Sequence, residues 1–239
     1  MNDKIDISVV VPVYNEEETL PLLVPQINDV LQNLGKSYEM IFVDDGSKDR
    51  SRALLKEMVP RYRQVRVLGF KYNCGQTAAW AAGLKEARGD VVITLDADLQ
   101  NDPRDIPMML EHLKEYDMVT GWRQKRDDSW VKRITSRIAN WIRNKSSGED
   151  IRDSGSGFRA YKRECLENIK LYKGLHRFMP TLVKMEGFRV IEIPIAHHPR
   201  KYGISKYTTW NRMWRTLADL LAVKWMKSRQ IHYEIEERT

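Results

Sequence analysis

The sequence predicts an α/β domain with a doubly wound, mostly parallel sheet, Rossmann-like in its layout. A chain of 239 residues with 42% apolar residues is long enough to bury one sizeable core. Short, almost continuously apolar segments alternate with amphipathic ones through its first half. This alternation is typical of parallel strands that helices cover on both faces.

The elements of the first half follow from this alternation. Short apolar runs predict strands at 7–13, 38–43, 65–70 and 91–95. Apolar residues at helical spacing predict helices at 17–34, 49–59 and 76–88, with Ser47 or Asp49 as the N-cap of the second. Ligands of such sheets bind beyond the carboxyl ends of the strands, so we expect functional side chains there.

The second half is less regular. We expect a helix from 103 to 116, a strand at 118–122 and a basic helix at 130–145. A Gly/Ser-rich turn at 153–157 precedes a strand at 158–161, helices at 162–169 and 176–186, and a strand at 188–195. A last helix covers 208–227, and we divide the chain into a main domain over 1–206 and a C-terminal segment over 207–239.

Composition restricts the function classes. A net charge of +7 suits an acidic partner, which leaves nucleic acid, anionic lipid or a phosphorylated small molecule open. Two cysteines are too few for a disulfide framework or a four-ligand zinc site, which fits a reducing compartment. No apolar run reaches the roughly 18–20 residues that span a bilayer, and no secretory signal is evident. We therefore expect a cytoplasmic chain that is not an integral membrane protein.

The most informative motif follows the strand at 91–95. Side chains two apart on extended backbone point the same way, so Asp96 and Asp98 can converge on one divalent cation. Mg²⁺ or Mn²⁺ prefers such oxygen ligands, and Gln100 could supply a third. The alternative is a pair of solvated acids in a loop. A metal at this place would neutralise charge on a leaving diphosphate.

Polar side chains also follow the first two strands. The first strand is followed by neither a glycine-rich dinucleotide motif nor a Walker loop, so a nucleotide would be bound by side chains such as Tyr14 and Glu16. Asp44 and Asp45 suit ring N–H groups and sugar hydroxyls. A plain strand-to-helix turn and an Asp-Gly turn are the structural alternatives for these two segments.

Taken in order, these motifs resemble the family 2 glycosyltransferases of the GT-A fold. The resemblance is to the branch of dolichyl-phosphate mannose synthases and bacterial polyprenyl-phosphate (undecaprenyl-phosphate) glycosyltransferases. It covers about Ile7 to Met226. The segments that carry it are 12–16, 44–47, 73–76, 96–100 with 102–103, 121–123, 156–159, 192–194, Arg200 and 203–206.

The resemblance implies a metal-dependent, inverting transfer of a sugar from a UDP- or GDP-linked donor to a polyprenyl phosphate such as undecaprenyl or dolichyl phosphate. It implies that Asp96, Asp98 and Gln100 bind the metal. It implies donor-side roles for Pro12, Tyr14, Glu16 and Asp44 on the nucleoside and for Arg200 near the diphosphate; Asp45 is a further candidate on this side. It implies that Arg123, Lys132 and Ser136 receive the acceptor phosphate, with Ser205 and Lys206 in a loop over the site.

The segment from Arg123 to Lys145 supports a phosphate acceptor on physical grounds. It holds eight basic and two acidic residues, and arginine can donate to two phosphate oxygens at once. A phosphate monoester, with a second pKa of about 6, is already a nucleophile at neutral pH, so a dedicated base is not required. We take Asp96, Asp98, Arg123 and Asp153 as candidate catalytic residues; the alternative for Asp153 is a turn acid.

The C-terminal helix carries an apolar stripe between basic residues. The stripe consists of Trp210, Met213, Trp214, Leu217, Leu220, Leu221 and Trp225, and the flanking cations are Arg212, Arg215, Lys224, Lys227 and Arg229. One interpretation is a helix at the cytoplasmic face of a membrane, where Trp and basic residues are favourable. The other is docking on the protein's own core or on a second subunit. A separate membrane subunit or a homo-oligomer is compatible with both.

Two rival functions remain. A family 2 transferase acting on a carbohydrate hydroxyl would need a general base and no basic cluster, so the Arg123 to Lys145 segment argues against it. A nucleic-acid-binding module would fit the charge and the seven tryptophans, but acids at the strand ends would repel its phosphates, so we expect no nucleic-acid partner. His197 and His198 lack partner ligands at suitable spacing and are interpreted as a loop pair.

Overall fold

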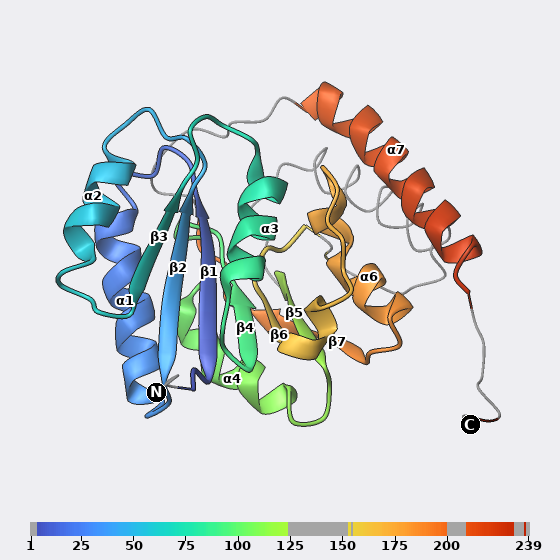
Figure 1. The fold of residues 1–239 in the computed structure, drawn as a ribbon, viewed down its shortest axis with the longest axis horizontal. Helices are drawn as coiled ribbons and strands as arrows, with labels where there is room; N and C mark the ends of the chain where they lie inside the picture. The colour runs from blue at the N-terminus through green and yellow to red at the C-terminus, as the bar shows by residue number, and fades with distance from the viewer. Residues whose placement is uncertain (1–3, 124–152, 154, 200–208, 232–236, 238–239) are drawn as a thin grey trace.

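The computed structural model describes residues 4–123, 153, 155–199, 209–231 and 237, with the backbone alone for 209–217. Seven strands form one sheet in the order β3-β2-β1-β4-β6-β5-β7 (Figure 1). The first three strands in the chain are β1 (Ile7–Val13), β2 (Tyr38–Asp44) and β3 (Val65–Gly69). The other four are β4 (Val91–Thr94), β5 (Met118–Arg123), β6 (Arg159–Lys162) and β7 (Val190–Ile195).

The sheet is mostly parallel, as predicted. Strands β1 to β4 all run in one direction, and only β6 runs antiparallel to its two neighbours, β4 and β5. Ile7 pairs with both Tyr38 and Val91, so β1, β2 and β4 start level with one another. The segments that follow these three strands therefore leave the sheet at the same edge.

Helices cover one face of the sheet with the first hydrophobic cluster. They are α1 (Leu20–Asn33), α2 (Ser51–Met58) and α4 (Ile106–His112), the last preceded by the short 3-10 helix η1 (Pro103–Asp105). Alternate residues of β1, such as Val9 and Val11, point into this layer and are fully buried together with Leu23 and Ile27 of α1. Successive side chains of β1 point to opposite faces of the sheet, and helices cover both faces. This explains why almost every residue of β1 is apolar.

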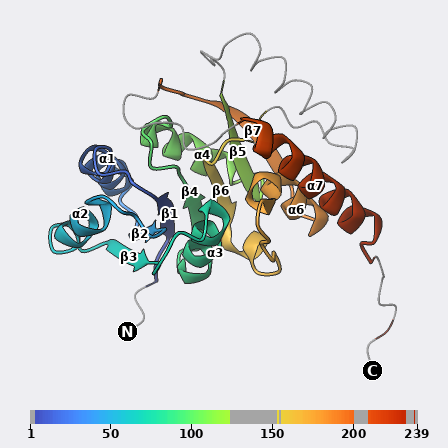
Figure 2. The same cartoon turned by 90° about the horizontal axis from the view of Figure 1, so that it is seen from above.

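The other face carries α3 (Gln76–Glu86), η2 (Arg163–Leu166), η3 (Leu175–Phe178), α6 (Met179–Met185) and α7 (Thr209–Ser228) (Figure 2). Under α3, Val10 of β1 packs with Trp80. Under α6 and α7, Met118 and Tyr161 form a cluster with residues of both helices, including Leu220 and Val223 of α7. Helix α7 therefore docks on the sheet layer through part of its surface.

The predicted strands all exist, with boundaries within two residues of those observed. The helix predicted at 162–169 is wrong, because only the 3-10 helix Arg163–Leu166 forms there. Its backbone and side chains are tied to the sheet instead: Arg163 N–H donates to the Asp90 carbonyl at 2.9 Å, and the Cys165 thiol donates to the Asp117 carbonyl at 3.2 Å. The helix predicted at 176–186 is divided into η3 and α6, and the one at 130–145 lies outside the described residues.

The N-cap prediction for α2 is also wrong in detail. Arg50 occupies the N-cap position rather than Ser47 or Asp49. The carboxylate of Asp49 still accepts the N–H of Ser51 at 3.0 Å, while the Ser47 hydroxyl accepts the N–H of Asn15 at 3.0 Å. The polar residues that suggested a cap thus connect the start of α2 to the end of β1.

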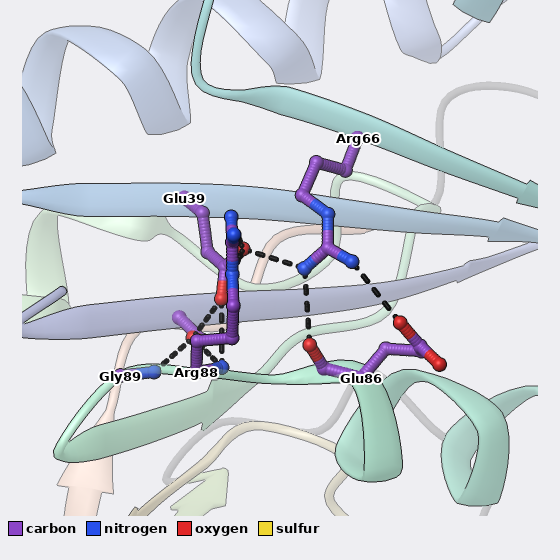
Figure 3. A network of polar contacts seen from close by, with 6 residues as sticks. Glu39, Arg66, Glu86, Arg88 and Gly89 are labelled. Carbon is purple, nitrogen blue, oxygen red and sulfur yellow. Dashed lines mark hydrogen bonds and ion pairs between the residues drawn. The ribbon is translucent and has the colours of Figure 1, made fainter. Parts of the chain in front are cut away.

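At the amino-terminal edge of the sheet, a buried carboxylate connects three segments (Figure 3). Glu39 of β2 is 2% exposed and accepts hydrogen bonds from the Ser8 hydroxyl at 2.7 Å, from Arg66 at 2.7 Å, and from the backbone N–H of Arg88 at 2.8 Å. Burial raises the pKa of Glu39, but these hydrogen bonds outweigh it and the pKa lies below its ordinary value. Ionised Glu39 therefore stabilises the fold.

Replacing Glu39 by Gln should lower the free energy of unfolding by about 1–3 kcal/mol at pH 7, because two arginines lose a buried partner but both can still reach water. The folded pKa is depressed, so this contribution is present above the unfolded pKa of about 4.3 and is lost as pH falls through the folded value. Urea denaturation followed by circular dichroism at pH 7 and at pH 3.5 would measure both effects.

The matched control is Glu86→Gln, because Glu86 is 48% exposed and pairs with Arg66 at 3.1 Å. An exposed pair of this kind contributes about 0–1 kcal/mol. Equal destabilisation by the two variants, or a Glu39→Gln effect that does not shrink at low pH, would contradict the account.

Candidate functional site

The carboxyl ends of β1, β2 and β4 meet at one edge of the sheet, and the acidic motifs follow them. The backbone there is joined from strand to strand: Leu95 N–H donates to the Val10 carbonyl at 3.1 Å, and Asp45 N–H donates to the Val13 carbonyl at 2.8 Å. The segments after the three strands are thereby fixed beside one another, as the sequence predicted.

Asp96 and Asp98 form the core of this edge. Gln76, the first residue of α3, donates its side-chain amide to the Asp96 carboxylate at 2.9 Å, and the backbone N–H of Gln100 donates to Asp98 at 3.2 Å. Burial, and then repulsion by Asp98, raise the pKa of Asp96 to about 6 although Arg159, Arg123 and Gln76 act in the opposite direction. Burial is the main cause of the shift, and the two arginines and Gln76 offset only part of it.

The chain before β6 packs directly against Asp96 at Gly157. A side chain at this position would collide with the Asp96 carboxylate, so the close approach requires glycine. The Thr94 hydroxyl donates to the Gly157 carbonyl at 2.8 Å and fixes the contact. Two residues later Arg159 is 3% exposed, with one guanidinium nitrogen donating to the His176 carbonyl at 2.8 Å. A buried cation thus lies under the acidic pair.

Asp153 and Arg123 form a two-point ion pair. The Arg123 guanidinium donates from Nε at 2.6 Å and from Nη2 at 2.9 Å to the two carboxylate oxygens of Asp153. Asp153 is 5% exposed, its backbone N–H donates to Glu192 at 3.1 Å, and Gly155 N–H donates to its carboxylate at 3.2 Å. The carboxylate predicted as a site residue therefore holds the arginine at the end of β5.

The residues present fit a hard divalent cation. Within the described residues, no group of three or more His, Cys, Asp or Glu side chains could form a complete all-protein site. Mg²⁺ typically takes one or two carboxylates and completes its shell with substrate phosphates and water, and the partly exposed pair Asp96 and Asp98 suits that pattern. A cation bound there would relieve the cost of keeping buried Asp96 ionised.

Gln100 has a second set of neighbours. Its side-chain amide nitrogen lies 3.4 Å from the His198 carbonyl and 3.5 Å from His197 Nε2. The backbone carbonyl of Gln100 accepts the N–H of His198 at 2.8 Å. Between it and Asp98, Leu99 adopts a positive φ of 58°, a conformation that costs energy for a non-glycine residue. The segment 197–198 thus packs against the acidic motif, which sequence reasoning did not foresee.

The end of β1 offers a hollow for a ligand. Pro12, Tyr14 and Glu16 are all partly exposed there, and a cavity of about 360 Å³ is lined by residues 15–19, Lys48 and Asp49. Asn15 has a positive φ of 53°, and its side-chain oxygen accepts Lys48 N–H at 2.8 Å. The Glu16 carboxylate accepts the Thr19 hydroxyl at 3.2 Å. Of the three side chains predicted for the nucleoside, Glu16 lines this cavity, whereas Pro12 and Tyr14 do not.

Asp44 and Asp45 are more buried than expected. Asp44 has no exposed surface and accepts Arg52 Nε at 2.5 Å. The Asp45 carboxylate accepts hydrogen bonds from Asn73 at 2.9 Å, from Cys74 N–H at 2.7 Å and from Gly75 N–H at 2.9 Å. Burial raises the pKa of Asp45, against these N–H contacts. Both acids organise the loops around the site.

Five of the predicted site residues lie outside the described part of the chain: Lys132, Ser136, Arg200, Ser205 and Lys206. Sequence reasoning gave no role to Gln76, Gly157 or Arg159, although the structure places all three at Asp96. Each of them belongs to a motif on which the family resemblance rests, so the motifs could have indicated a role. Their contacts with the acidic motif, however, span 20 to 63 residues of sequence, and no local pattern predicts such contacts.

Solved structures with the same fold are glycosyltransferases. The chain aligns with glucosyl-3-phosphoglycerate synthase from Mycobacterium tuberculosis in complex with Mn²⁺, uridine diphosphate and phosphoglyceric acid at a TM-score of 0.71, with 18% identity over 95% of this chain and 80% of that one. Another structure of that protein, with Mg²⁺ and uridine diphosphate, gives a TM-score of 0.67, with 18% identity over 93% and 79%. These similarities confirm the GT-A fold.

Curated relatives resemble the chain more strongly in sequence. A dodecaprenyl-phosphate galacturonate synthase of Rhizobium johnstonii is 35% identical over 96% of this chain and 70% of its own length. An undecaprenyl-phosphate 4-deoxy-4-formamido-L-arabinose transferase of Pectobacterium atrosepticum is 40% identical over 87% and 64%, and one of Edwardsiella ictaluri is 41% identical over 84% and 62%. The chain thus spans roughly two thirds of the length of these proteins.

The sequence model of glycosyl transferase family 2 matches residues 8–170, from β1 through the segment after β6. The match includes the acidic edge, the Arg123–Asp153 pair and the glycine at Asp96. Together with the fold and the relatives, it shows that the chain belongs to glycosyl transferase family 2.

Proposed function

We propose that this chain transfers a sugar from a nucleoside diphosphate sugar to a polyprenyl phosphate, with Mg²⁺ or Mn²⁺ bound at Asp96 and Asp98. The observation that carries the proposal is the partly buried carboxylate pair at the carboxyl edge of β4, where burial, and then repulsion by Asp98, raise the pKa of Asp96 to about 6. The names of the relatives supply the acceptor class, because they are transferases of dodecaprenyl and undecaprenyl phosphate.

The leaving group is the first requirement of the reaction. Asp96 and Asp98, with Gln100 as the proposed third oxygen ligand, would hold a divalent cation, which would supply Lewis-acid stabilisation of the departing diphosphate. Gln76 orients Asp96 through the 2.9 Å hydrogen bond, and buried Arg159 adds positive charge beneath the pair. Gln76 would thereby hold the Asp96 carboxylate in position for the cation.

The donor nucleoside would lie in the hollow at the end of β1. Glu16 lines this hollow, and the partly exposed Tyr14 and Pro12 precede it in the chain, Tyr14 with a ring suited to stacking. Asp44 and Asp45 would support the site without contacting the nucleoside. Asp44 binds Arg52, and Asp45 binds residues 73–75, which directly precede α3. Arg200, Ser205 and Lys206 remain proposed for the diphosphate and for the loop over the site. A uridine or a guanosine base fits this description, and a donor panel separates them.

The acceptor phosphate would be bound by Arg123, with Lys132 and Ser136 from the basic segment. A phosphate oxygen attacks the anomeric carbon as the bond to the diphosphate oxygen breaks, and the diphosphate leaves with the electron pair. A phosphate monoester with a second pKa of about 6 is ionised at neutral pH, so no proton has to be removed. Direct displacement of this kind inverts the anomeric centre.

This reaction would take place at a membrane surface, because a polyprenyl chain partitions into lipid. Within the described residues, the structure contains no helix that is long and apolar enough to span a bilayer. We propose peripheral binding at the cytoplasmic face, either by this chain itself or with the help of a membrane subunit or a homo-oligomer.

The proposal predicts metal-dependent transfer that Asp98→Asn removes. Purified protein, Mn²⁺, a short-chain polyprenyl phosphate in detergent and a panel of radiolabelled UDP- and GDP-sugars should give organic-extractable label with at least one donor. Asp98→Asn should lower kcat/KM by a factor on the order of 10²–10³, the loss typical of removing one strong electrostatic contact from a transition state. Chelation of the metal should have a similar effect.

The matched control is Asp90→Asn, because Asp90 is an exposed acid at the opposite edge of the sheet, paired with Lys4 at 2.8 Å. Its activity should stay within about twofold of the unchanged chain, as expected for an exposed pair. Donor-dependent transfer to a glycan hydroxyl with no lipid label would overturn the acceptor assignment and leave the family assignment intact.

For Asp153, the ion pair with Arg123 predicts a positioning role rather than a base. Asp153→Asn should raise the acceptor KM about tenfold or more, because the two-point ion pair that positions Arg123 is lost. The pH profile of kcat should keep its shape, because the substitution removes no proton-transfer group. Asp153→Glu should recover part of the acceptor affinity. Steady-state kinetics between pH 6 and 9 would measure the acceptor KM and the pH profile of kcat. A loss of kcat with an altered pH profile and an unchanged acceptor KM would instead identify Asp153 as a general base.

A further inference from the structure

The chain just after β7 is attached to the acidic motif. His197 forms an antiparallel bridge with Asn101, and the N–H of His198 donates to the Gln100 carbonyl at 2.8 Å. The Gln100 amide nitrogen lies 3.4 Å from the His198 carbonyl. The nitrogen of this amide thus contacts the segment after β7, whereas the oxygen is the atom that a hard cation would take. A segment to which the proposed reaction gives no role therefore borders a proposed metal ligand.

Side chains add two further connections between these segments. His198 Nε2 lies 3.2 Å from the carboxylate of Asp102, which is 8% exposed. The N–H of Ala196 donates to the Asp105 carboxylate at 2.8 Å. Asp102 also accepts hydrogen bonds from the guanidinium of Arg104, but Arg104 is only two residues away in the chain. The contact with His198 is therefore one that joins Asp102 to a distant part of the sequence.

The backbone that these contacts hold is strained. Leu99, between Asp98 and Gln100, has a φ of 58°, and a leucine keeps this conformation only where its surroundings determine it. The same stretch borders a cavity of about 650 Å³, whose lining includes Leu99, Asp102 and His198. Side chains that line a cavity lack packing partners on that side. The polar contacts with the segment after β7 therefore matter more for the conformation of the motif.

We propose that His198 is a positioning residue for the metal site. It binds Asp102 and the Gln100 carbonyl and thereby holds Leu99 in its left-handed conformation. This conformation sets the position of Gln100 relative to Asp98, and with it the affinity for Mg²⁺ or Mn²⁺. The inference rests on the proposed function, because it concerns the cation at the same carboxylates. It adds a residue about one hundred positions away in the chain that determines how well the cation is bound.

The contact of His198 can be removed without opening the core. Its side chain is 49% exposed, so another side chain of similar size should leave the hydrophobic clusters intact. Leu99, in contrast, is partly buried and packs against the first cluster. The effect of His198 on metal binding can therefore be measured apart from its effect on the stability of the fold.

Isothermal titration of UDP and of GDP, with Mn²⁺ and with EDTA, tests the proposal without acceptor or turnover. His198→Phe keeps a ring and removes Nε2, so the nucleotide that binds the unchanged chain with Mn²⁺ should bind about tenfold more weakly. Its affinity in EDTA should stay within about twofold. His198→Gln, whose amide nitrogen can reach the same carboxylate, should recover most of the loss. Leu99→Gly added to His198→Phe should recover part of it, because glycine adopts a positive φ without strain.

The matched control is His112→Phe, which changes a partly exposed histidine at the far end of α4. It should bind like the unchanged chain, and thermal unfolding should show that each variant folds. Unchanged Mn²⁺-dependent binding by His198→Phe, an equal loss in the control, or a loss that neither His198→Gln nor Leu99→Gly reduces would overturn this inference alone. If the unchanged chain bound neither nucleotide more tightly with Mn²⁺ than with EDTA, the proposed function would fail together with it.

Discussion

The burial of Asp96 beside a second carboxylate, Asp98, is the constraint on which the rest of the site depends. Burial, and then repulsion by Asp98, raise the pKa of Asp96 to about 6, which expresses the cost of keeping this carboxylate ionised. The surroundings reduce it: Gln76 donates a hydrogen bond, and Arg159 and Arg123 supply positive charge. We propose that the remaining cost is relieved by a cation and, through it, by a bound diphosphate.

Stabilising contacts at the other edge of the sheet offset the cost of this arrangement. The amino-terminal edge of the same sheet has a fully neutralised carboxylate, Glu39, with partners from three segments. The carboxyl-terminal edge instead has two residues at positive φ, Asn15 and Leu99, directly beside the acidic motifs. One edge thus fixes the strands, and the other contains backbone strain and a carboxyl group of raised pKa where a ligand would be bound.

Much of the fold and the position of the site could be predicted from local pattern. Apolar runs determined every strand, and the parallel order brought Tyr14, Asp45 and Asp96 to the ends of neighbouring strands. What could not be predicted are contacts set by tertiary packing. Asp153 meets Arg123 across thirty residues, and Asp45 turns toward 73–75. The apolar stripe of a helix does not show which part of it contacts the core. The sequence therefore could not show that Leu220 of α7 is buried and that Leu221 is exposed.

The central claim is that the carboxylate pair binds a diphosphate through a divalent cation, and isothermal titration of UDP and GDP into the protein tests it most directly. With Mn²⁺ present, one of the two nucleotides should bind at least about tenfold more tightly than in EDTA, because cation and diphosphate bind cooperatively at the pair. Equal affinity with Mn²⁺ and with EDTA, or no binding of either nucleotide, would contradict it.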